Sequence, residues 1–275
     1  MEENSVPPSA AQTTEEGLKI TVATVTWNAG ALIERTIESV EQQTYAHVEH
    51  LIIDGNSHDN TLELVHHYQE RNSHAAVRHE IVCISEPDEG LYDAMNKAID
   101  MATGNYIVFL NAGDVFHETT TLSKIVAAAE RYGKELPAVV YGNTDIVDDE
   151  GHFIRHRRLA PPERLTWRSF RSGMLVCHQA FFARTDFARQ FHYDLRYRFS
   201  ADFDWCIRIM HNAKRRKTPL CNAHVIVADY LNEGTTTRNH KASLRERFTI
   251  MRRHYGIVVT LWMHAWFTLR NFILK

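Results

Sequence analysis

The sequence predicts an α/β fold in which helices cover a mostly parallel sheet. Two observations predict it: short β-branched apolar runs alternate with segments whose apolar residues recur every three or four positions, and turn-forming residues separate the two kinds of segment. Alternation of this kind implies parallel strands that are joined by right-handed crossovers, with helices on both faces of the sheet.

The first two strand and helix units are the clearest. The run KITVATVTW, residues 19–27, is a β-branched strand, and residues 31–41 then repeat apolar side chains at helical spacing. The run VEHLIID, residues 48–54, is the second strand. A turn rich in Gly, Asn and Asp follows it, and Asp59 or Asn60 is the expected N-cap of a helix over residues 61–71.

The later elements continue the pattern and then change character. Strands are expected at EIVCIS, NYIVFLN and AVVYG, and helices at residues 90–102 and 119–132. After Gly142, the run DIVDDEGHFI predicts a hairpin, PPERL a helix start, HQAFFAR a strand and ADFDWCIRIMHNA a helix. We therefore expect one main domain with additions.

Composition narrows the classes of protein. The net charge of −3 over 275 residues gives no global reason to expect a nucleic-acid partner. Residues 1–17 are polar and acidic without an apolar run, so we expect a disordered leader and no secretory signal. The four cysteines are far apart in the sequence, which favours a reducing cytoplasm over a disulfide framework.

The loops that follow the strands are the candidate site, because ligands of such sheets bind outside the carboxyl ends of the strands. These loops cover residues 26–30, 54–59, 85–90 and 111–114. Asp54 stands directly at a strand end. From its position it either accepts hydrogen bonds from a base or ribose, or forms an Asx turn that caps the next helix.

At this point the residues carry a resemblance. The string from Ser85 to Asp100, with FLNAGD behind it, resembles the family 2 inverting glycosyltransferases, especially the bacterial subgroup that assembles exopolysaccharides such as colanic acid. TVTWN, IIDGNSHDNT, HQAFF, SADFDW and NEGTTT follow in the order of the family's landmarks. The resemblance implies a GT-A fold over residues 18–237, with a Rossmann-like nucleotide-sugar half (18–142) and an acceptor half (143–237).

The resemblance also implies roles for individual residues. Thr26, Asp54 and Glu86 would line the nucleoside pocket, with Asn28 in the same first loop, and Asp114 would stand near the diphosphate. In SADFDW, Asp202 aligns with the base that takes the proton from the acceptor hydroxyl, and Asp204 is the competing candidate. From spacing alone, both acids are ordinary helix caps.

The metal element is incomplete. Many relatives hold Mg²⁺ or Mn²⁺ with a D-x-D element, but here Asn111 and Gly113 replace its acids and only Asp114 keeps its charge. A metal held by Asp114, the diphosphate and waters is therefore expected to bind more weakly. His178 is a compensating candidate or a buried structural histidine, and Thr236 and Arg238 are suitable diphosphate donors.

The tail, residues 238–275, combines basic residues with apolar helices. IVVTLWMHAWFTLRNFIL is interrupted by His264, Arg270 and Asn271, which makes it a poor membrane-spanning segment. It either lies at an anionic membrane surface, with Trp262, Trp266 and Phe267 inserted, or packs on the domain or at a homodimer interface.

The function that these observations predict is inverting transfer of a sugar from a UDP- or GDP-sugar to a hydroxyl of a glycan or lipid-linked acceptor. The site would lie in the cytoplasm, or peripherally at the inner face of the membrane. A dehydrogenase is disfavoured because no G-x-G-x-x-G follows the first strand. The alternative is a degenerate member that binds a nucleotide sugar or a partner without turnover.

Overall fold

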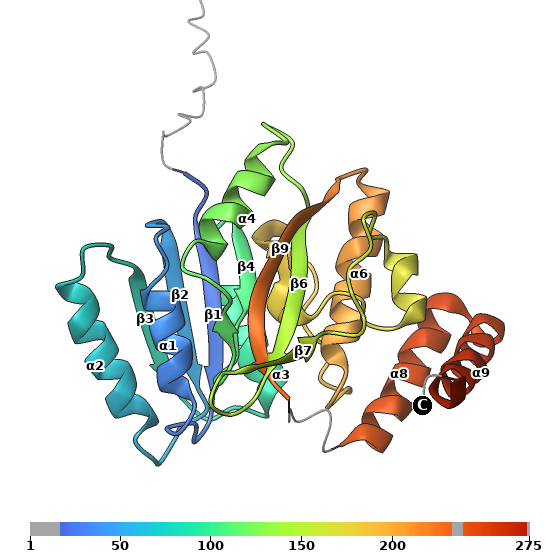
Figure 1. Ribbon diagram of the computed structural model, residues 1–275, viewed down its shortest axis with the longest axis horizontal. Helices are drawn as coiled ribbons and strands as arrows, with labels where there is room; N and C mark the ends of the chain where they lie inside the picture. Colours follow the sequence, from blue (N-terminus) through green and yellow to red (C-terminus); the bar gives the residue numbers. More distant parts are fainter. Residues whose placement is uncertain (1–16, 233–238, 274–275) are drawn as a thin grey trace, which may run out of the picture.

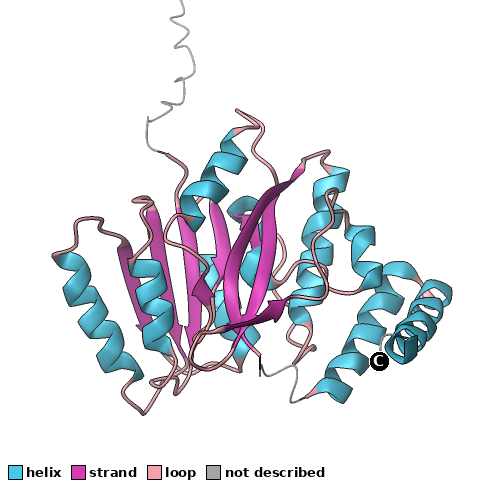
Figure 2. Ribbon diagram, viewed as in Figure 1, coloured by secondary structure: helices cyan, strands magenta, loops and turns pink. Residues whose placement is uncertain are grey.

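The computed structural model describes residues 17–232 and 239–273, and within them the strands form a single mixed sheet (Figure 1). The strand order is β3-β2-β1-β4-β8-β6-β9-β5, and β7 pairs with the outer part of β6. Figure 2 shows helices on both faces of this sheet and a pair of helices beyond one end. The predicted α/β class is confirmed.

The first half of the chain is fully parallel, as the alternation predicted. Its elements are β1 (Ile20–Thr26), α1 (Ile33–Glu41), β2 (Val48–Asp54), α2 (Thr61–Ser73), β3 (Glu80–Ser85), α3 (Leu91–Met101) and β4 (Tyr106–Phe109). In register, β1 pairs with β2 from Ile20 opposite Val48 to Thr26 opposite Asp54. The carboxyl ends of these strands therefore meet along one edge.

Strand alternation explains why helices cover both faces. In β2, Ile52 packs with Ile33 of α1 and Val65 of α2, whereas Leu51 and Ile53 belong to the core that holds α3. Successive side chains of a strand point to opposite faces, so a continuous apolar run needs a helical cover on each side.

The second half adds strands of both directions. Its elements are β5 (Val115–Phe116), α4 (Thr121–Glu130), β6 (Val139–Val147), β7 (Phe153–His156), β8 (Phe181–Arg184), α5 (Thr185–Ala188), α6 (Ala201–Arg215) and β9 (Leu220–Leu231). Because β8 runs antiparallel to β4 and β6, its start lies at the edge where β4 ends. The 3-10 helix His178–Ala180 immediately precedes β8, so residues far apart in sequence meet there.

Two expectations need correction. PPERL does not begin a helix; a 3-10 helix begins later, at Trp167, where the Thr166 and Ser169 side chains form a capping box. Strands β5 and β9 were not predicted. β9 is twelve residues long and bends, with register shifts against β6 and a positive φ at His224, and this interrupts the simple alternation that marks a strand.

The chain closes with α8 (His240–Tyr255) and α9 (Ile257–Ile273), which pack against each other and against the edge of the domain (Figure 1). Gly256 separates them with a φ of 81°, a conformation that favours glycine. Within residues 17–232 and 239–273, no helix combines the length and the apolar character needed to cross a bilayer.

Candidate active site

Asp202 lies at the start of α6, inside the edge where the parallel strands end. Its Oδ1 accepts a hydrogen bond from the backbone N–H of Phe203 (2.8 Å) and from the hydroxyl of Tyr92 (3.3 Å). Burial alone raises the pKa of this carboxyl, but His178, Arg247 and the Phe203 N–H outweigh burial, and the net pKa lies below its ordinary value. Asp202 is therefore a carboxylate at neutral pH.

His178 connects Asp202 to the end of β4. Its Nδ1 lies 3.4 Å from Asp202 Oδ2, and its Nε2 lies 3.1 Å from Asn111 Nδ2. Since the Asn111 amide donates to Nε2, the neutral ring carries its proton on Nδ1, facing the carboxylate. His178 is largely buried and has partners on both ring nitrogens, and both partners are other candidate residues of the site.

Asp114 is the buried acid of the same edge. Gln179 donates a hydrogen bond from Nε2 to Asp114 Oδ2 (2.8 Å), and Thr36 of α1 holds the backbone of the loop by donating to the Asp114 carbonyl (2.8 Å). Burial raises the pKa of Asp114 to about 6, although Gln179 and His178 act in the opposite direction. A cation beside it would restore the charged form.

The residues around Asp114 fit a hard divalent ion. Asn111 Oδ1 and Gln179 Oε1 are buried oxygens that lack a hydrogen-bond partner within the described structure, and the Asp114 carboxylate lies in the same loop and hydrogen-bond network. Carboxylate and amide oxygens are the ligands that Mg²⁺ and Mn²⁺ accept. Gly113 has a φ of 101°, so the second acid of a D-x-D element would be strained at that position.

The first loops form a tight network. Asp54 is buried and accepts hydrogen bonds from the Ser57 N–H (2.9 Å), the Ser57 hydroxyl (2.5 Å) and the Ser85 hydroxyl (2.6 Å). Asn28 has a φ of 46° and accepts from the His58 N–H (2.8 Å). These contacts fix both loops. Thr26 differs, because its hydroxyl is buried without a partner in the described structure.

Of the two expected N-cap residues of α2, Asn60 holds the N-cap position without a side-chain cap hydrogen bond, and Asp59 precedes it and contacts the start of the helix. Its Oδ1 accepts from the Thr61 N–H at the first residue of α2 (3.0 Å), and its Oδ2 accepts from the Gly30 N–H (2.9 Å). One side chain thereby ties the first loop to the second helix.

Glu86 and Asp204 have partners inside the protein. The exposed Glu86 carboxylate pairs with Lys97 Nζ (2.8 Å), which leaves it at the solvent side of the third loop. Asp204 is fully buried between Arg208 Nε of the same helix (2.6 Å) and His254 Nε2 of α8 (2.7 Å), so its contact with His254 joins α6 to α8. Thr236 and Arg238 lie outside the described residues.

The sequence did not single out three contributors to the site. Gln179 follows His178 and is the direct partner of Asp114, whereas Tyr92 and Arg247 act on Asp202 from α3 and α8. Tyr92 is also stacked on Tyr193, which is stacked on Trp205, so an aromatic wall supports one side of the carboxylate. The pairing of Gln179 with His178 in HQ was the only signal that the sequence offered.

Among the described residues, two cavities are lined by elements of the second half of the chain and by α8 and α9. The larger, about 690 Å³, is lined by residues such as Pro219 and Leu220 at the start of β9, the opposite end of the strand from the site, so size alone does not locate the chemistry. The smaller, about 250 Å³, lies between α8, α9 and residues 159–173 and is lined by Phe203, Arg247 and Met251 among others. Phe203 follows Asp202 directly, so this cavity borders the site.

Comparisons with known proteins identify the family of the chain. The family model described as Glycosyl transferase family 2 matches residues 21–191. A PGL/p-HBAD biosynthesis glycosyltransferase of Mycobacterium tuberculosis is 32% identical over 207 residues, which cover 74% of this chain and 73% of the relative. The amylovoran biosynthesis glycosyltransferase AmsB of Erwinia amylovora is 25% identical over 218 residues, covering 76% of this chain and 70% of the relative.

Solved structures share the fold. S. aureus TarS 1–349 in complex with UDP-GlcNAc has a TM-score of 0.65 at 15% identity, covering 94% of this chain and 74% of that chain. The mannosyltransferase PcManGT of Pyrobaculum calidifontis, in complex with GDP-Man and Mn²⁺, has a TM-score of 0.62 at 16% identity, covering 91% and 71%. The predicted GT-A fold is thereby confirmed.

Proposed function

The chain belongs to glycosyltransferase family 2, and from that membership we propose that it transfers a sugar, with inversion, from a UDP- or GDP-sugar to a hydroxyl of a glycan or lipid-linked acceptor. One observation carries the proposal: Asp202, His178, Asn111, Gln179 and Asp114 form a connected network at the carboxyl edge of the sheet. Ligands of open α/β sheets bind at this edge.

The donor is assigned to residues 18–142 and the acceptor to residues 143–237. The loops after β1, β2 and β3 are fixed by their own hydrogen bonds, which makes a rigid floor for a nucleoside. Thr26 offers the free hydroxyl there, and Glu86 the exposed carboxylate. The similar structures solved with UDP-GlcNAc and with GDP-Man support a nucleotide diphosphate donor. Because their bases differ, both UDP and GDP must be tested.

The proposed chemistry is a single displacement. The acceptor oxygen attacks the anomeric carbon, the bond from that carbon to the diphosphate oxygen breaks, and the acceptor proton passes to Asp202. A base must be ionised before it accepts a proton, and the lowered pKa of Asp202 meets that condition. His178, protonated on the nitrogen that faces Asp202, orients the carboxylate and stabilises its charge.

The diphosphate needs positive charge as it departs. A bound Mg²⁺ or Mn²⁺ supplies electrostatic stabilisation of that leaving group. Asp114, Asn111 and Gln179 are the residues that would hold the ion, because each places a buried oxygen in this part of the site. Asp114 carries the only charge among them, so we expect the ion to bind more strongly in the presence of the donor diphosphate.

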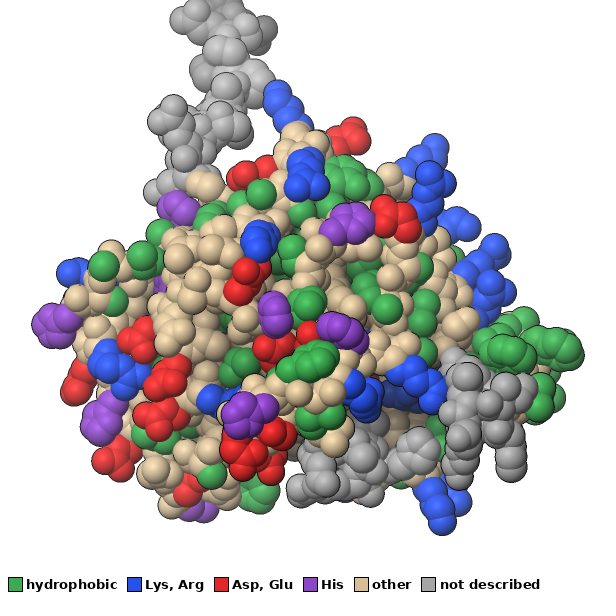
Figure 3. Space-filling model, in the orientation of Figure 1, with side chains coloured by type: hydrophobic (Ala, Val, Ile, Leu, Met, Phe, Trp, Pro, Cys, Tyr) green, Lys and Arg blue, Asp and Glu red, His purple; other side chains and the backbone are tan. Residues whose placement is uncertain are grey.

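The proposal that the acceptor is lipid-linked rests on the small cavity and on α9, which extend the acceptor side beyond residue 237. The cavity beside Phe203 is lined mainly by apolar side chains together with Arg247, which suits a lipid-linked phosphate-bearing acceptor. One face of α9 exposes Val258, Leu261, Trp262, Trp266 and Leu269, and Figure 3 shows this apolar patch at one end of the molecule. We assign that face to the inner surface of a membrane; its competing occupant is a second copy of the chain.

Phe267 does not belong to that exposed face. It packs against the core from α9, whereas the two tryptophans that were expected to share its role are exposed. The four cysteines are free thiols.

Calorimetry with UDP and with GDP, each in Mn²⁺ and again in EDTA, tests the donor. Tight binding of one nucleotide that weakens in EDTA supports Asp114 as the charged ligand of a metal. Release of nucleotide from the sugar donor in the presence of a lipid-linked acceptor, with NMR assignment of the new anomeric configuration, tests inversion. Nucleotide binding without turnover would favour a non-catalytic member, and binding of neither nucleotide would overturn the donor assignment.

A further inference from the structure

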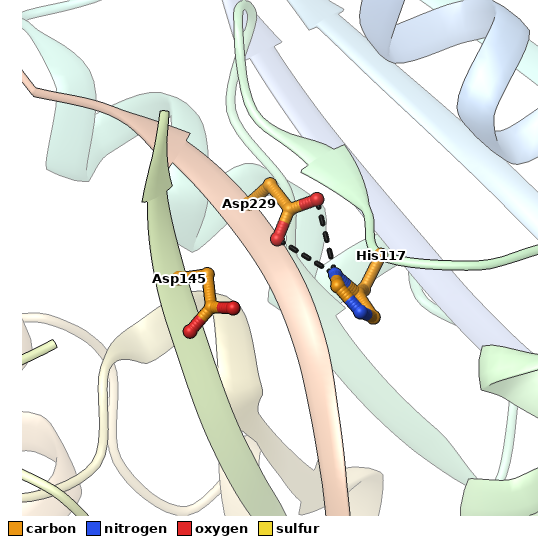
Figure 4. A group of neighbouring side chains, drawn as sticks. All are labelled: His117, Asp145 and Asp229. Carbon is orange, nitrogen blue, oxygen red and sulfur yellow. Dashed lines mark hydrogen bonds and ion pairs between the residues drawn. The ribbon is translucent and has the colours of Figure 1, made fainter. Parts of the chain in front are cut away.

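The strands β5, β6, β7 and β9 bring two acids and two histidines side by side. Asp145 on β6 is the register partner of Asp229 on β9 and also of His156 on β7. His117 follows β5, whose Val115 is the register partner of Asp229. Figure 4 shows the side chains of His117, Asp229 and Asp145 on the same face of the sheet, although they come from three separate parts of the chain.

The ligand atoms of three of these residues are close enough to share an ion. One nitrogen or oxygen from each of His117, Asp145 and Asp229 lies within 4.8 Å of the others. His117 Nδ1 is 2.9 Å from one oxygen of Asp229 and 3.1 Å from the other. His156 Nδ1 holds Asp145 from the far side at 2.8 Å.

The two carboxylates are an unfavourable pair without a cation. Like charges directly opposite each other on neighbouring strands destabilise a sheet. The Asp145 side chain is only 4% exposed, so water screens it poorly, whereas His117 is 38% exposed and gives solvent access to the group.

We propose that His117, Asp145 and Asp229 bind a divalent transition-metal ion of the Zn²⁺ class, with His156 orienting Asp145. Imidazole nitrogen combined with carboxylate oxygen suits Zn²⁺, Co²⁺ and Ni²⁺, whereas Mg²⁺ and Ca²⁺ prefer all-oxygen sites. A hydrogen-bonded outer residue such as His156 is typical around a ligating carboxylate. The ion clamps β5, β9 and β6 together.

This site is separate from the one proposed for the diphosphate. Side chains alternate along β5 and its flanks, so His117 and Val115 point to the opposite side from Phe116, which is buried in the core. Asp114 shares the buried side and pairs with Gln179. Zn²⁺ binding at His117, Asp145 and Asp229 can therefore be tested independently of the proposed transfer reaction.

Zinc titration of the full chain, stripped with EDTA and dialysed, tests the site by calorimetry and by thermal unfolding. His117→Gln removes the ligand but keeps a donor toward Asp229, and Asp229→Asn is a second, conservative variant. Each variant is expected to bind one Zn²⁺ ion per chain with an affinity at least about tenfold lower than that of the wild type, because even outer residues of metal sites contribute that much. In these variants, the rise in Tm that Zn²⁺ causes in the wild type is expected to disappear. Circular dichroism of each variant without metal confirms that it is folded.

Two control variants isolate the site. Asp114→Asn removes the acid of the diphosphate site, and His152→Ala disrupts the exposed group Asp148, Glu150 and His152 on the neighbouring hairpin turn. Both should retain the Zn²⁺ equivalent that His117→Gln loses, and Co²⁺ bound at that site should give visible absorption bands. The proposal is overturned if Zn²⁺ binds equally to the wild type, His117→Gln and Asp229→Asn. It is also overturned if only His152→Ala loses Zn²⁺ binding. Displacement of Zn²⁺ by an equal concentration of Mg²⁺ would overturn it as well.

Discussion

His178 Nδ1 lies 3.4 Å from Asp202 Oδ2, across 24 residues of sequence and between two different elements. The contact exists because β8 runs antiparallel to β4, so the 3-10 helix that begins at His178 and leads into β8 lies at the edge where the parallel strands end. The helix that carries Asp202 starts at the same edge. A histidine that looked ambiguous in the sequence is thereby placed beside the acid that aligns with the family's base.

Asp202→Asn is expected to lower the transfer rate by about 10²- to 10⁴-fold, the usual contribution of a general base. The amide keeps the hydrogen bond from the Phe203 N–H but cannot take the acceptor proton. Nucleotide binding should persist, since Asp202 does not lie in the nucleotide loops. Steady-state transfer assays and calorimetry measure the two properties separately.

Asp100→Asn is the matched control for that variant. Asp100 also pairs with a histidine, His192, at 2.7 Å, but the pair lies on the surface. A wild-type rate for Asp202→Asn, or an equal loss in both variants, would contradict the role of Asp202 as base.

Asp114 should make metal-assisted nucleotide binding depend on pH. Burial raises the pKa of its carboxyl to about 6, so the acid is mostly protonated below that pH and cannot ligate a cation well. Affinity for nucleotide in Mn²⁺ is expected to rise between about pH 5 and pH 7, whereas affinity in EDTA should vary less. Calorimetry at several pH values in each condition measures the difference.

The same raised pKa affects stability without metal. The folded state binds the Asp114 proton more tightly than the unfolded state, so this group's contribution to stability is fully present below the unfolded pKa and is lost as pH rises through about 6. Asp114→Asn removes this loss and retains an acceptor for Gln179. The Tm of Asp114→Asn minus the Tm of the wild type should therefore increase from pH 5 to pH 8. A Tm difference that does not change with pH would argue that Asp114 ionises normally.

Asp204 is expected to affect stability more than chemistry. Its buried carboxylate pairs with Arg208 and His254, so Asp204→Ala leaves the Arg208 guanidinium without its carboxylate and His254 without its hydrogen-bond partner. The change should cost about 3–5 kcal/mol in unfolding free energy. Urea denaturation measures this. Combining the change with His254→Ala should give less than the sum of the two single effects, because the residues share a contact.

Much of the fold could be predicted because local pattern and global topology agree in the first half. There, each apolar strand is followed by an amphipathic helix, and the register of β1 with β2 aligns the loops that hold Thr26 and Asp54. β9 escaped prediction because it bends and its burial does not alternate. Its pairing with β6 is a long-range relationship that spacing in the sequence does not contain.

The site was predictable only in part for the same reason. Single residues such as Asp202 and Asp114 stood out by alignment with a family, but Gln179, Tyr92 and Arg247 contribute through contacts between distant elements. The Asp145 and Asp229 pair is an extreme case, since only the strand register brings the two acids together.

The exposed face of α9 is expected to bind anionic vesicles. Val258 and Trp262 are 77% and 76% exposed, four residues apart and so on one face of the helix, and the preceding helix exposes Lys241, Arg245, Arg252 and Arg253. Apolar insertion combined with basic residues is the usual basis of interfacial binding. The double variant Val258→Ser, Trp262→Ser should therefore co-sediment less with vesicles that contain phosphatidylserine, and high salt should weaken binding by the wild type.

Phe153→Ser is the control, because Phe153 is an exposed aromatic residue on β7, remote in sequence from α9. It should partition like the wild type. Equal partitioning of all three proteins would remove the membrane assignment, and analytical ultracentrifugation would then decide whether the same face joins two copies. If the wild type forms a concentration-dependent dimer and the double variant Val258→Ser, Trp262→Ser is monomeric, α9 belongs to an interface between subunits. The apolar face cannot insert into lipid while a second chain covers it.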